Sequence, residues 1–228
     1  MAIVAGLGLA MAQSVSAAEV LLNGGFETGS FAPEWSVGPN DAGGGACDQV
    51  WTVASSGSAC WDLGAPSGNY GAYTIINGAG PVTRTFSQSF ELVSATTATL
   101  SWLEAAKWDV PIEAAEGGIF SIDLLDSGSN FITNIYTEDF LAETSGAYGL
   151  TANSTEVDFA GNSLVTGDTV YIAFTVFFSE FFTGNVGKLV DNVVLGPELP
   201  PAGVPEPGSL ALLGLGLAAL GLRRRATA

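Results

Sequence analysis

The sequence predicts an all-β protein: an antiparallel β-sandwich flanked by an N-terminal signal helix and a short C-terminal hydrophobic helix. Three observations lead to this fold class. Between the two ends of the 228-residue chain there is no amphipathic stretch of helical length. Short runs that alternate apolar and polar residues recur instead, separated by Gly, Asn, Asp and Ser. Continuous apolar runs are confined to the two ends.

The alternating runs predict about ten strands, and with no crossover helices these must pair antiparallel. The strongest run carries branched and aromatic residues on one face and Tyr171, Ala173, Thr175 and Phe177 on the other. A domain of about 180 residues buries roughly 70% of the surface that its unfolded chain exposes, so its core needs no cofactor. The predicted strands include residues 82–91, 97–103, 119–125, 131–136, 169–178 and 189–195.

Residues 1–18 are predicted to be a signal peptide. Their apolar run is too short to span a membrane, and Val15-Ser16-Ala17-Ala18 supplies the small residues of a cleavage site. The basic segment expected before the run is missing, which fits a start codon placed too far downstream; the alternative is a buried N-terminal helix. The β-sandwich domain is then predicted over 19–196, followed by a linker over 197–203.

The C-terminal segment 204–225 has three parts in order. Val204-Pro205-Glu206-Pro207 is a rigid, extended break, because a proline disfavours helix at the residue before it. The 14 residues Ser209–Leu222 are Leu, Ala and Gly after the serine, and as a helix they would span about 21 Å of a roughly 30 Å hydrocarbon layer. Arg223, Arg224 and Arg225 then form a cytoplasmic stop. The helix is therefore a marginal membrane anchor.

This order and spacing resemble the PEP-CTERM sorting signal of Gram-negative bacteria. The resemblance implies export, transient anchoring in the inner membrane and recognition by an exosortase-type membrane protease. Release or attachment at the cell surface or in the extracellular matrix would follow, commonly alongside exopolysaccharide production. An ordinary tail anchor would explain the helix and the arginines but not the Pro-Glu-Pro.

Charge and composition exclude several classes of function. The net charge is −17, and residues 19–199 hold 22 acidic residues against three basic ones, Arg84, Lys107 and Lys188. Nucleic acids and anionic lipids need a basic surface, so neither is expected to bind the folded part. Histidine is absent, which excludes Ser-His-Asp and Cys-His catalytic units and His-ligated zinc or iron. With no phosphate loop, nucleophile elbow or metalloprotease motif either, the protein is not predicted to be an enzyme.

Two motifs bracket the central domain. Asn23-Gly24-Gly25-Phe26-Glu27-Thr28-Gly29, with Trp35 shortly after it, resembles the opening strand of jelly-roll carbohydrate-binding modules. Val190-Asp191-Asn192-Val193, followed by Leu195, resembles their closing strand. The resemblance implies a galactose-binding-like jelly roll.

Glu27 and Asp191 are predicted to hold a structural calcium ion. Strict alternation places Asp191 on the face of Leu189 and Val193, which should point to the core, and Lys188 on the opposite face. A buried carboxylate needs a cation or hydrogen-bond donors, and two carboxylates with backbone carbonyls suit Ca²⁺. The resemblance to carbohydrate-binding modules implies calcium at this place. The alternative is that Asp191 lies at a frayed strand end and accepts hydrogen bonds from backbone amides.

The two cysteines, Cys47 and Cys60, are predicted to form a disulfide, because an exported chain meets an oxidising compartment. The alternative is two free thiols. Most of the aromatic residues are expected in the core, while Trp108, Phe181 and Phe182 lie in polar or turn contexts and are candidate glycan contacts.

Together these features predict an exported protein of the extracellular polysaccharide matrix that binds glycans or has a structural role. One alternative is a structural matrix protein with no ligand. The other is a glycoside hydrolase that uses two carboxylates, although no spacing singles out a pair.

Overall fold

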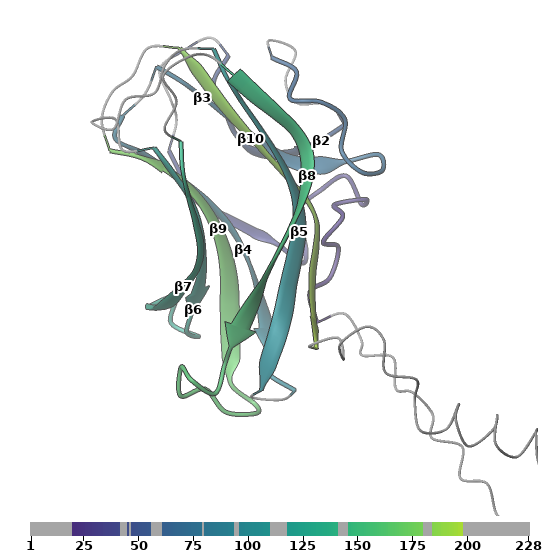
Figure 1. The fold of residues 1–228 in the computed structure, drawn as a ribbon, viewed down its shortest axis with the longest axis vertical. Helices are drawn as coiled ribbons and strands as arrows, with labels where there is room; N and C mark the ends of the chain where they lie inside the picture. The colour runs from purple at the N-terminus through teal and green to yellow at the C-terminus, as the bar shows by residue number, and fades with distance from the viewer. Residues whose placement is uncertain are drawn as a thin grey trace, which may run out of the picture. The chain divides into compact units, whose positions relative to one another are not determined.

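The structure is a computed structural model that describes residues 20–41, 45, 47–55, 61–78, 80–93, 96–109, 118–140, 146–179 and 184–197. In these ranges the chain forms ten strands and two five-stranded sheets (Figure 1). Sheet A has the order β1-β4-β9-β6-β7, and sheet B has the order β2-β3-β10-β5-β8. The strands are β1 (Ser36–Asn40), β2 (Gln49–Ala54), β3 (Gly71–Asn77), β4 (Val82–Glu91), β5 (Thr97–Trp108), β6 (Ile119–Leu125), β7 (Phe131–Asp139), β8 (Gly146–Asp158), β9 (Thr169–Phe178) and β10 (Asn185–Pro197).

The predicted antiparallel β-sandwich is confirmed. Every strand pairing is antiparallel, and strands distant in the sequence, such as β4 and β9, lie side by side, as in a jelly roll. The predicted terminal helices, the signal peptide and the tail lie outside the described residues, as does the predicted linker after Pro197, which is the last residue of β10.

Four strands, β1, β2, β3 and β8, were not among the named predictions. β3 is buried on both faces, because residues 61–70 cover the side that faces away from sheet A, and its sequence therefore shows no alternation. β8 is an edge strand with mostly exposed side chains, so it lacks an apolar face that could be recognised. Both departures from the period-two pattern follow from where the strands lie in the sheet.

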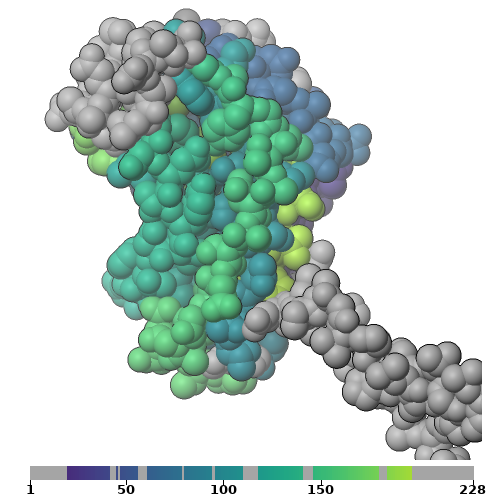
Figure 2. Space-filling view, viewed as in Figure 1, coloured from purple at the N-terminus to yellow at the C-terminus, as the bar shows by residue number. Residues whose placement is uncertain are grey.

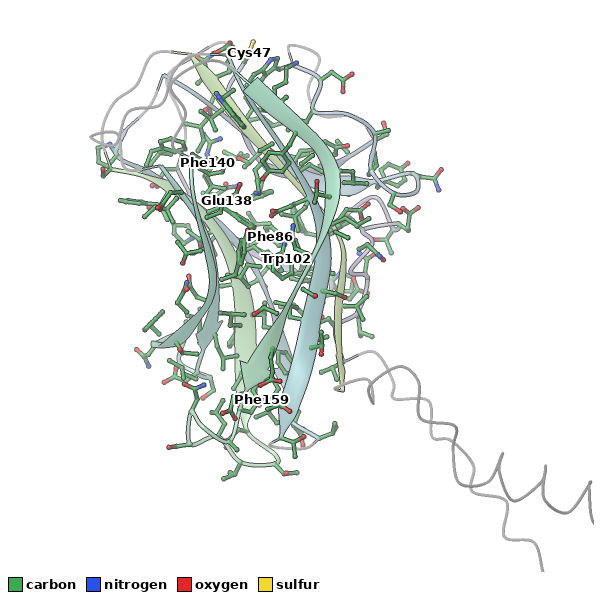
Figure 3. All side chains as sticks on the ribbon, viewed as in Figure 1. Cys47, Phe86, Trp102, Glu138, Phe140 and Phe159 are labelled. Atoms are coloured by element: carbon green, nitrogen blue, oxygen red, sulfur yellow. The ribbon has the colours of Figure 1, made fainter. Side chains whose placement is uncertain are left out.

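A single aromatic core fills the space between the two sheets. Phe86 of β4 lies at its centre, stacked on Phe174 of β9 with their ring centroids 4.9 Å apart. The ring of Trp51, from the other sheet, meets Phe86 edge-on at 4.7 Å. Figure 3 shows Phe86 and Trp102 in the middle of the sandwich, where both are buried. This packing fixes the separation of the two sheets.

Arg84 ties the sheets together from inside the sandwich. It is fully buried on the inner face of β4 and forms an ion pair with Asp48, with Nη2 2.6 Å from Oδ1 and 2.7 Å from Oδ2. Its Nη1 also donates to the backbone carbonyls of Gln49 in β2 and Ile75 in β3, each at 2.7 Å. The guanidinium therefore satisfies polar groups of sheet B that would otherwise be buried without partners.

Lys188 of β10 forms the second tie and reaches sheet A in the opposite direction. Its Nζ lies 2.5 Å from Glu138 of β7 and 3.0 Å from Glu104 of β5, and it donates to the hydroxyl of Tyr148 at 2.6 Å. It also lies 4.1 Å from the ring centroid of Phe120. Lys188 thus lies on the opposite face of β10 from Asp191, as predicted. Its face is the one that lines the core between the sheets.

Replacing Lys188 with methionine should lower the free energy of unfolding by about 3–5 kcal/mol, because the buried carboxylate of Glu104 and the partly buried carboxylate of Glu138 then lose their common cation. Chemical denaturation measures this loss. Adding Glu104→Gln and Glu138→Gln to the variant should restore much of the stability. The matched control is Lys107→Met, at a partly exposed lysine, with an expected loss of less than about 1 kcal/mol. Equal losses at the two lysines would contradict the role given to Lys188.

Candidate functional site

The two predicted calcium ligands are brought to the same region. The backbone N–H of Val193 donates to the carbonyl of Gly24 at 2.9 Å, so the opening motif lies against the closing strand. Glu27 and Asp191 are near enough for the negative charge of Glu27 to raise the pKa of Asp191. The contact is tight: a Cβ on Gly24 would lie 1.8 Å from the carbonyl oxygen of Val193.

Asp191 is buried, but not in the core between the sheets. A bulge between Asp191 and Val194 breaks the alternation of β10, and Asn192 within it has a positive φ of 48°. Leu189 and Asp191 therefore face outward, beneath residues 61–70, whereas Val193 and Leu195 face the main core. The expectation that all of these side chains share one face is wrong, because a bulge shifts the following residues to the other face.

Both carboxylates accept hydrogen bonds from the backbone of the covering segment. Asp191 Oδ2 accepts from the N–H of Ser67, and its Oδ1 accepts from the N–H of Asn192, each at 2.7 Å. Glu27 accepts from the N–H and the side-chain amide of Asn69 at 3.0 and 2.9 Å, and these bonds lower its pKa. Burial raises the pKa of Asp191 to about 6, against the opposing effect of its two hydrogen bonds.

Carboxylate oxygens are the ligands that a hard cation prefers. A buried carboxylate with a raised pKa, beside a second carboxylate, would be stabilised by a bound Ca²⁺. The described residues contain no cluster of three or more acidic, histidine or cysteine side chains, so six to eight ligands would have to include backbone carbonyls or water. The calcium site stays a prediction, with Glu27 and Asp191 as its carboxylates.

The other predicted residues are placed only in part. Trp108 is the last residue of β5 and is partly buried, with its ring 6.4 Å from that of Tyr148 in an edge-on contact. Its role as a glycan contact stays a prediction. Phe181, Phe182 and Cys60 lie outside the described residues, as does the sorting segment 204–225. The disulfide between Cys47 and Cys60 stays a prediction.

A surface that the sequence analysis did not single out lies on the outer face of sheet A. Figure 1 shows β6 and β7 bowed toward sheet B, and in Figure 2 the outline of the molecule is indented where their teal atoms lie. The edge of the face formed by these two strands is therefore concave. We use the term outer face for the outward side chains of β4, β9, β6 and β7: Thr83, Thr85, Ser87, Ser89, Tyr171, Ala173, Thr175, Phe177, Ile119, Ser121, Asp123, Leu125, Phe131, Asn134, Thr137 and Asp139.

The centre of the outer face is a polar floor. Strand register aligns Thr85, Thr175, Ser121 and Thr137 in one row across the four strands, with Asp123 and Asn134 in the next row. The floor is internally hydrogen-bonded: Asp123 accepts from Ser121 Oγ and Asn134 Nδ2, both at 2.8 Å. The hydroxyl of Thr137 donates to Asn134 Oδ1, and those of Thr85 and Thr175 lie 2.9 Å apart.

Aromatic and aliphatic side chains flank this floor on both sides. Phe177 and Ile119 form the row at one end, and Tyr171, Leu125 and Phe131 form the row at the other. Phe131 is 65% exposed. Tyr171 and Phe177 are six residues apart on β9, which separates the two rows by about 20 Å. The sequence signal was the outward face of 169–178, where two aromatic residues enclose Ala173 and Thr175.

The inner carboxylates Glu104 and Glu138 form the other acidic pair, and they are committed to internal partners. Glu104 accepts from Trp102 Nε1 at 3.0 Å and from Asn153 Nδ2 at 2.9 Å, while Glu138 accepts from the hydroxyl of Tyr148 at 2.9 Å. Both also contact Lys188. Figure 3 shows Glu138 near Phe140, inside the sandwich. A glycosidase needs two carboxylates that flank an accessible sugar, which differs from this arrangement.

Comparisons with known proteins agree with the sorting motif and with the jelly-roll fold that the sequence predicts. Residues 203–225 match the PEP-CTERM protein-sorting motif, which marks an exported protein processed by an exosortase. No curated protein matches the chain. In the described ranges, no helix combines the length and the apolar composition needed to cross a bilayer.

Solved structures similar to this chain share its jelly-roll fold. A Stig cyclase, Fisc from Fischerella sp. TAU, is 18% identical, with 80% of this chain and all 100% of the cyclase covered at a TM-score of 0.50. The module TmCBM61 in complex with β-1,4-galactotriose is 21% identical, with coverages of 79% and 99% and a TM-score of 0.45. CBM27-1 of Caldicellulosiruptor saccharolyticus, in complex with mannohexaose, is 12% identical, with coverages of 76% and 94% and a TM-score of 0.44. The likeness concerns the fold alone, and it does not assign a function by itself.

Calcium should raise the melting temperature more than magnesium does at equal ionic strength, because the ion would bind only the folded state. The gain in stability is about 2.7 kcal/mol at a hundredfold excess over the dissociation constant. Asp191→Asn and Glu27→Gln should each remove most of this gain, whereas Glu156→Gln, at an exposed carboxylate on β8, should retain it. Thermal unfolding in each salt is the measurement, and identical shifts with the two ions would refute the site.

Without calcium, the free energy of unfolding should fall as the pH rises from about 4 to about 6. The pKa of Asp191 is raised to about 6 in the folded state from its ordinary 3.8, so the folded protein binds the extra proton in this window. Below pH 4 the carboxyl is neutral in both states, and above pH 6 the folded protein carries a buried charge. Urea titrations at several pH values should show this slope in the wild type, and it should be absent or much weaker in Asp191→Asn.

Proposed function

We propose that this protein is an exported glycan-binding component of the extracellular matrix and that the outer face of sheet A is its binding surface. The polar floor between two apolar rows carries the proposal. Sugars present hydroxyl groups at their edges and apolar C–H faces, so they pair with hydroxyl, amide and carboxylate side chains and pack on aromatic rings. The sorting motif supports a location outside the cytoplasm, where polysaccharide would be available.

The geometry suits an extended chain that lies along the strands. The apolar rows are separated by about 20 Å, so a linear oligosaccharide could contact both rows and cross the floor between them. The floor offers both hydrogen-bond donors and acceptors, from Asn134, Asp123 and several hydroxyl groups. Because these groups are already oriented by one another, little conformational entropy would be lost when a sugar binds.

Binding, rather than catalysis, is the activity that we propose. Of the inner carboxylates, neither Glu104 nor Glu138 is free to act as an acid or a base, because both are held by Lys188. On the outer face, Asp123 lies in the floor and Asp139 at one edge, with one row of side chains between them along the strands. We further propose that the tail anchors the protein transiently in the inner membrane of a Gram-negative cell, and that exosortase processing then delivers it to the cell surface.

The rival function is a structural matrix protein with no ligand. The same internal hydrogen bonds favour it, because Asp123, Asn134, Ser121 and Thr137 satisfy one another without a sugar. The two functions differ in what happens when the exposed rings are removed: only a binding surface loses affinity for a polysaccharide.

The full chain, purified in mild detergent, should be retarded in gels that contain one of three uncharged probes: β-1,4-galactan, β-1,4-mannan or mixed-linkage β-glucan. Phe131→Ala and Tyr171→Ala should each weaken binding to the retarding polysaccharide by about threefold to tenfold, through loss of ring stacking. The matched control is Tyr70→Ala, which removes a ring on the segment covering sheet B and should leave the affinity unchanged. Titration calorimetry gives the affinities. No retardation by any probe, or equal effects of all three variants, would favour the structural role.

A further inference from the structure

The described basic side chains all lie away from the outer face. Arg84 and Lys188 are fully buried between the sheets, each paired with carboxylates. Lys107 lies on the side of sheet B that faces away from sheet A. Its Nζ donates to the carbonyl of Asp62 at 3.1 Å and lies 5.1 Å from the ring centroid of Trp61. In the described residues, the outer face therefore carries no positive charge that could receive an anionic group.

Negative charge, by contrast, is built into its floor. Asp123 lies in the middle of β6, one row from Thr175 and Ser121, and Asp139 is exposed at the edge. The carboxylate of Asp123 is held on both oxygens, by Ser121 and by Asn134. It is therefore fixed in place and cannot swing away from an approaching ligand. Rows of side chains are about 7 Å apart along a strand, so any sugar on the floor lies close to this charge.

We propose that the outer face selects uncharged polysaccharide segments and rejects acidic ones, and that Asp123 is the residue that sets this specificity. The inference rests on the proposed function, because it concerns the ligand of the same surface. A sugar hydroxyl can donate to the lone pairs that Asp123 keeps free of its two donors. A sugar carboxylate can neither donate to Asp123 nor find a cation nearby, and it is repelled at short range.

The test compares the three uncharged probes with carboxymethylated forms of the same polysaccharides, so that the backbone is constant and only the charge differs. The full chain is used in 10 mM and in 1 M salt, where the Debye length falls from about 30 Å to about 3 Å. For the wild type in low salt, we expect the carboxymethylated form to bind at least about tenfold more weakly than the uncharged form. This ratio of affinities should become smaller in high salt. In low salt, Asp123→Asn should reduce the ratio of the two affinities by about threefold or more.

The readout is the ratio of the two affinities, which a loss of folded protein alone would not change. Asp123→Ser serves as a second variant if Asp123→Asn is poorly folded. Glu156→Gln removes one negative charge from sheet B and is the matched control, expected to leave the ratio unchanged within about twofold. If Asp123→Asn and Glu156→Gln shift the ratio equally, or if the wild type binds both forms alike in low salt, the inference is overturned while glycan binding stands. If no uncharged probe binds, the proposed function itself fails.

Discussion

Arg84 and Lys188 tie the two sheets together across the aromatic core, and the arrangement of the polar side chains around them follows from this constraint. A buried cation is tolerated only with close partners, so Asp48, Glu104 and Glu138 are drawn inward with their hydrogen-bonding neighbours. The two ties point in opposite directions, from sheet A to sheet B and from sheet B to sheet A. Sliding one sheet over the other would break both networks at once.

The same constraint shapes the surface. A chain with few basic residues that places two of them inside leaves its described exterior with one partly exposed lysine and many carboxylates. Such a surface repels polyanions at long range. Specificity at one face still needs a fixed charge at short range, because long-range repulsion is screened by salt. The fixed carboxylate of Asp123 in the floor therefore has an effect that the general negative charge of the domain does not have.

The sequence predicted those strands that have one face buried and one face exposed. The run 169–178 coincides with β9 (Thr169–Phe178), and the period-two pattern also located β4 and β6. The pattern fails where burial is not one-sided, as in β3, or where alternation is interrupted, as at the bulge after Asp191. Glu27 and Asp191 could be paired from motifs at the two ends of the domain. The outer face could not, because it is assembled from four strands whose register depends on the whole fold.

The position of β10 links the fold to the sorting of the protein. β10 is the central strand of sheet B, with hydrogen bonds to β3 on one side and β5 on the other, and it ends at Pro197. The sorting motif begins at residue 203, only a few residues later. Sheet B is therefore incomplete until almost the entire chain before the tail is available. Once β10 is in place, cleavage beyond it would remove no strand of the sandwich, because every pairing of the sheet lies upstream. Removal of the tail and stability of the domain are thus physically separable.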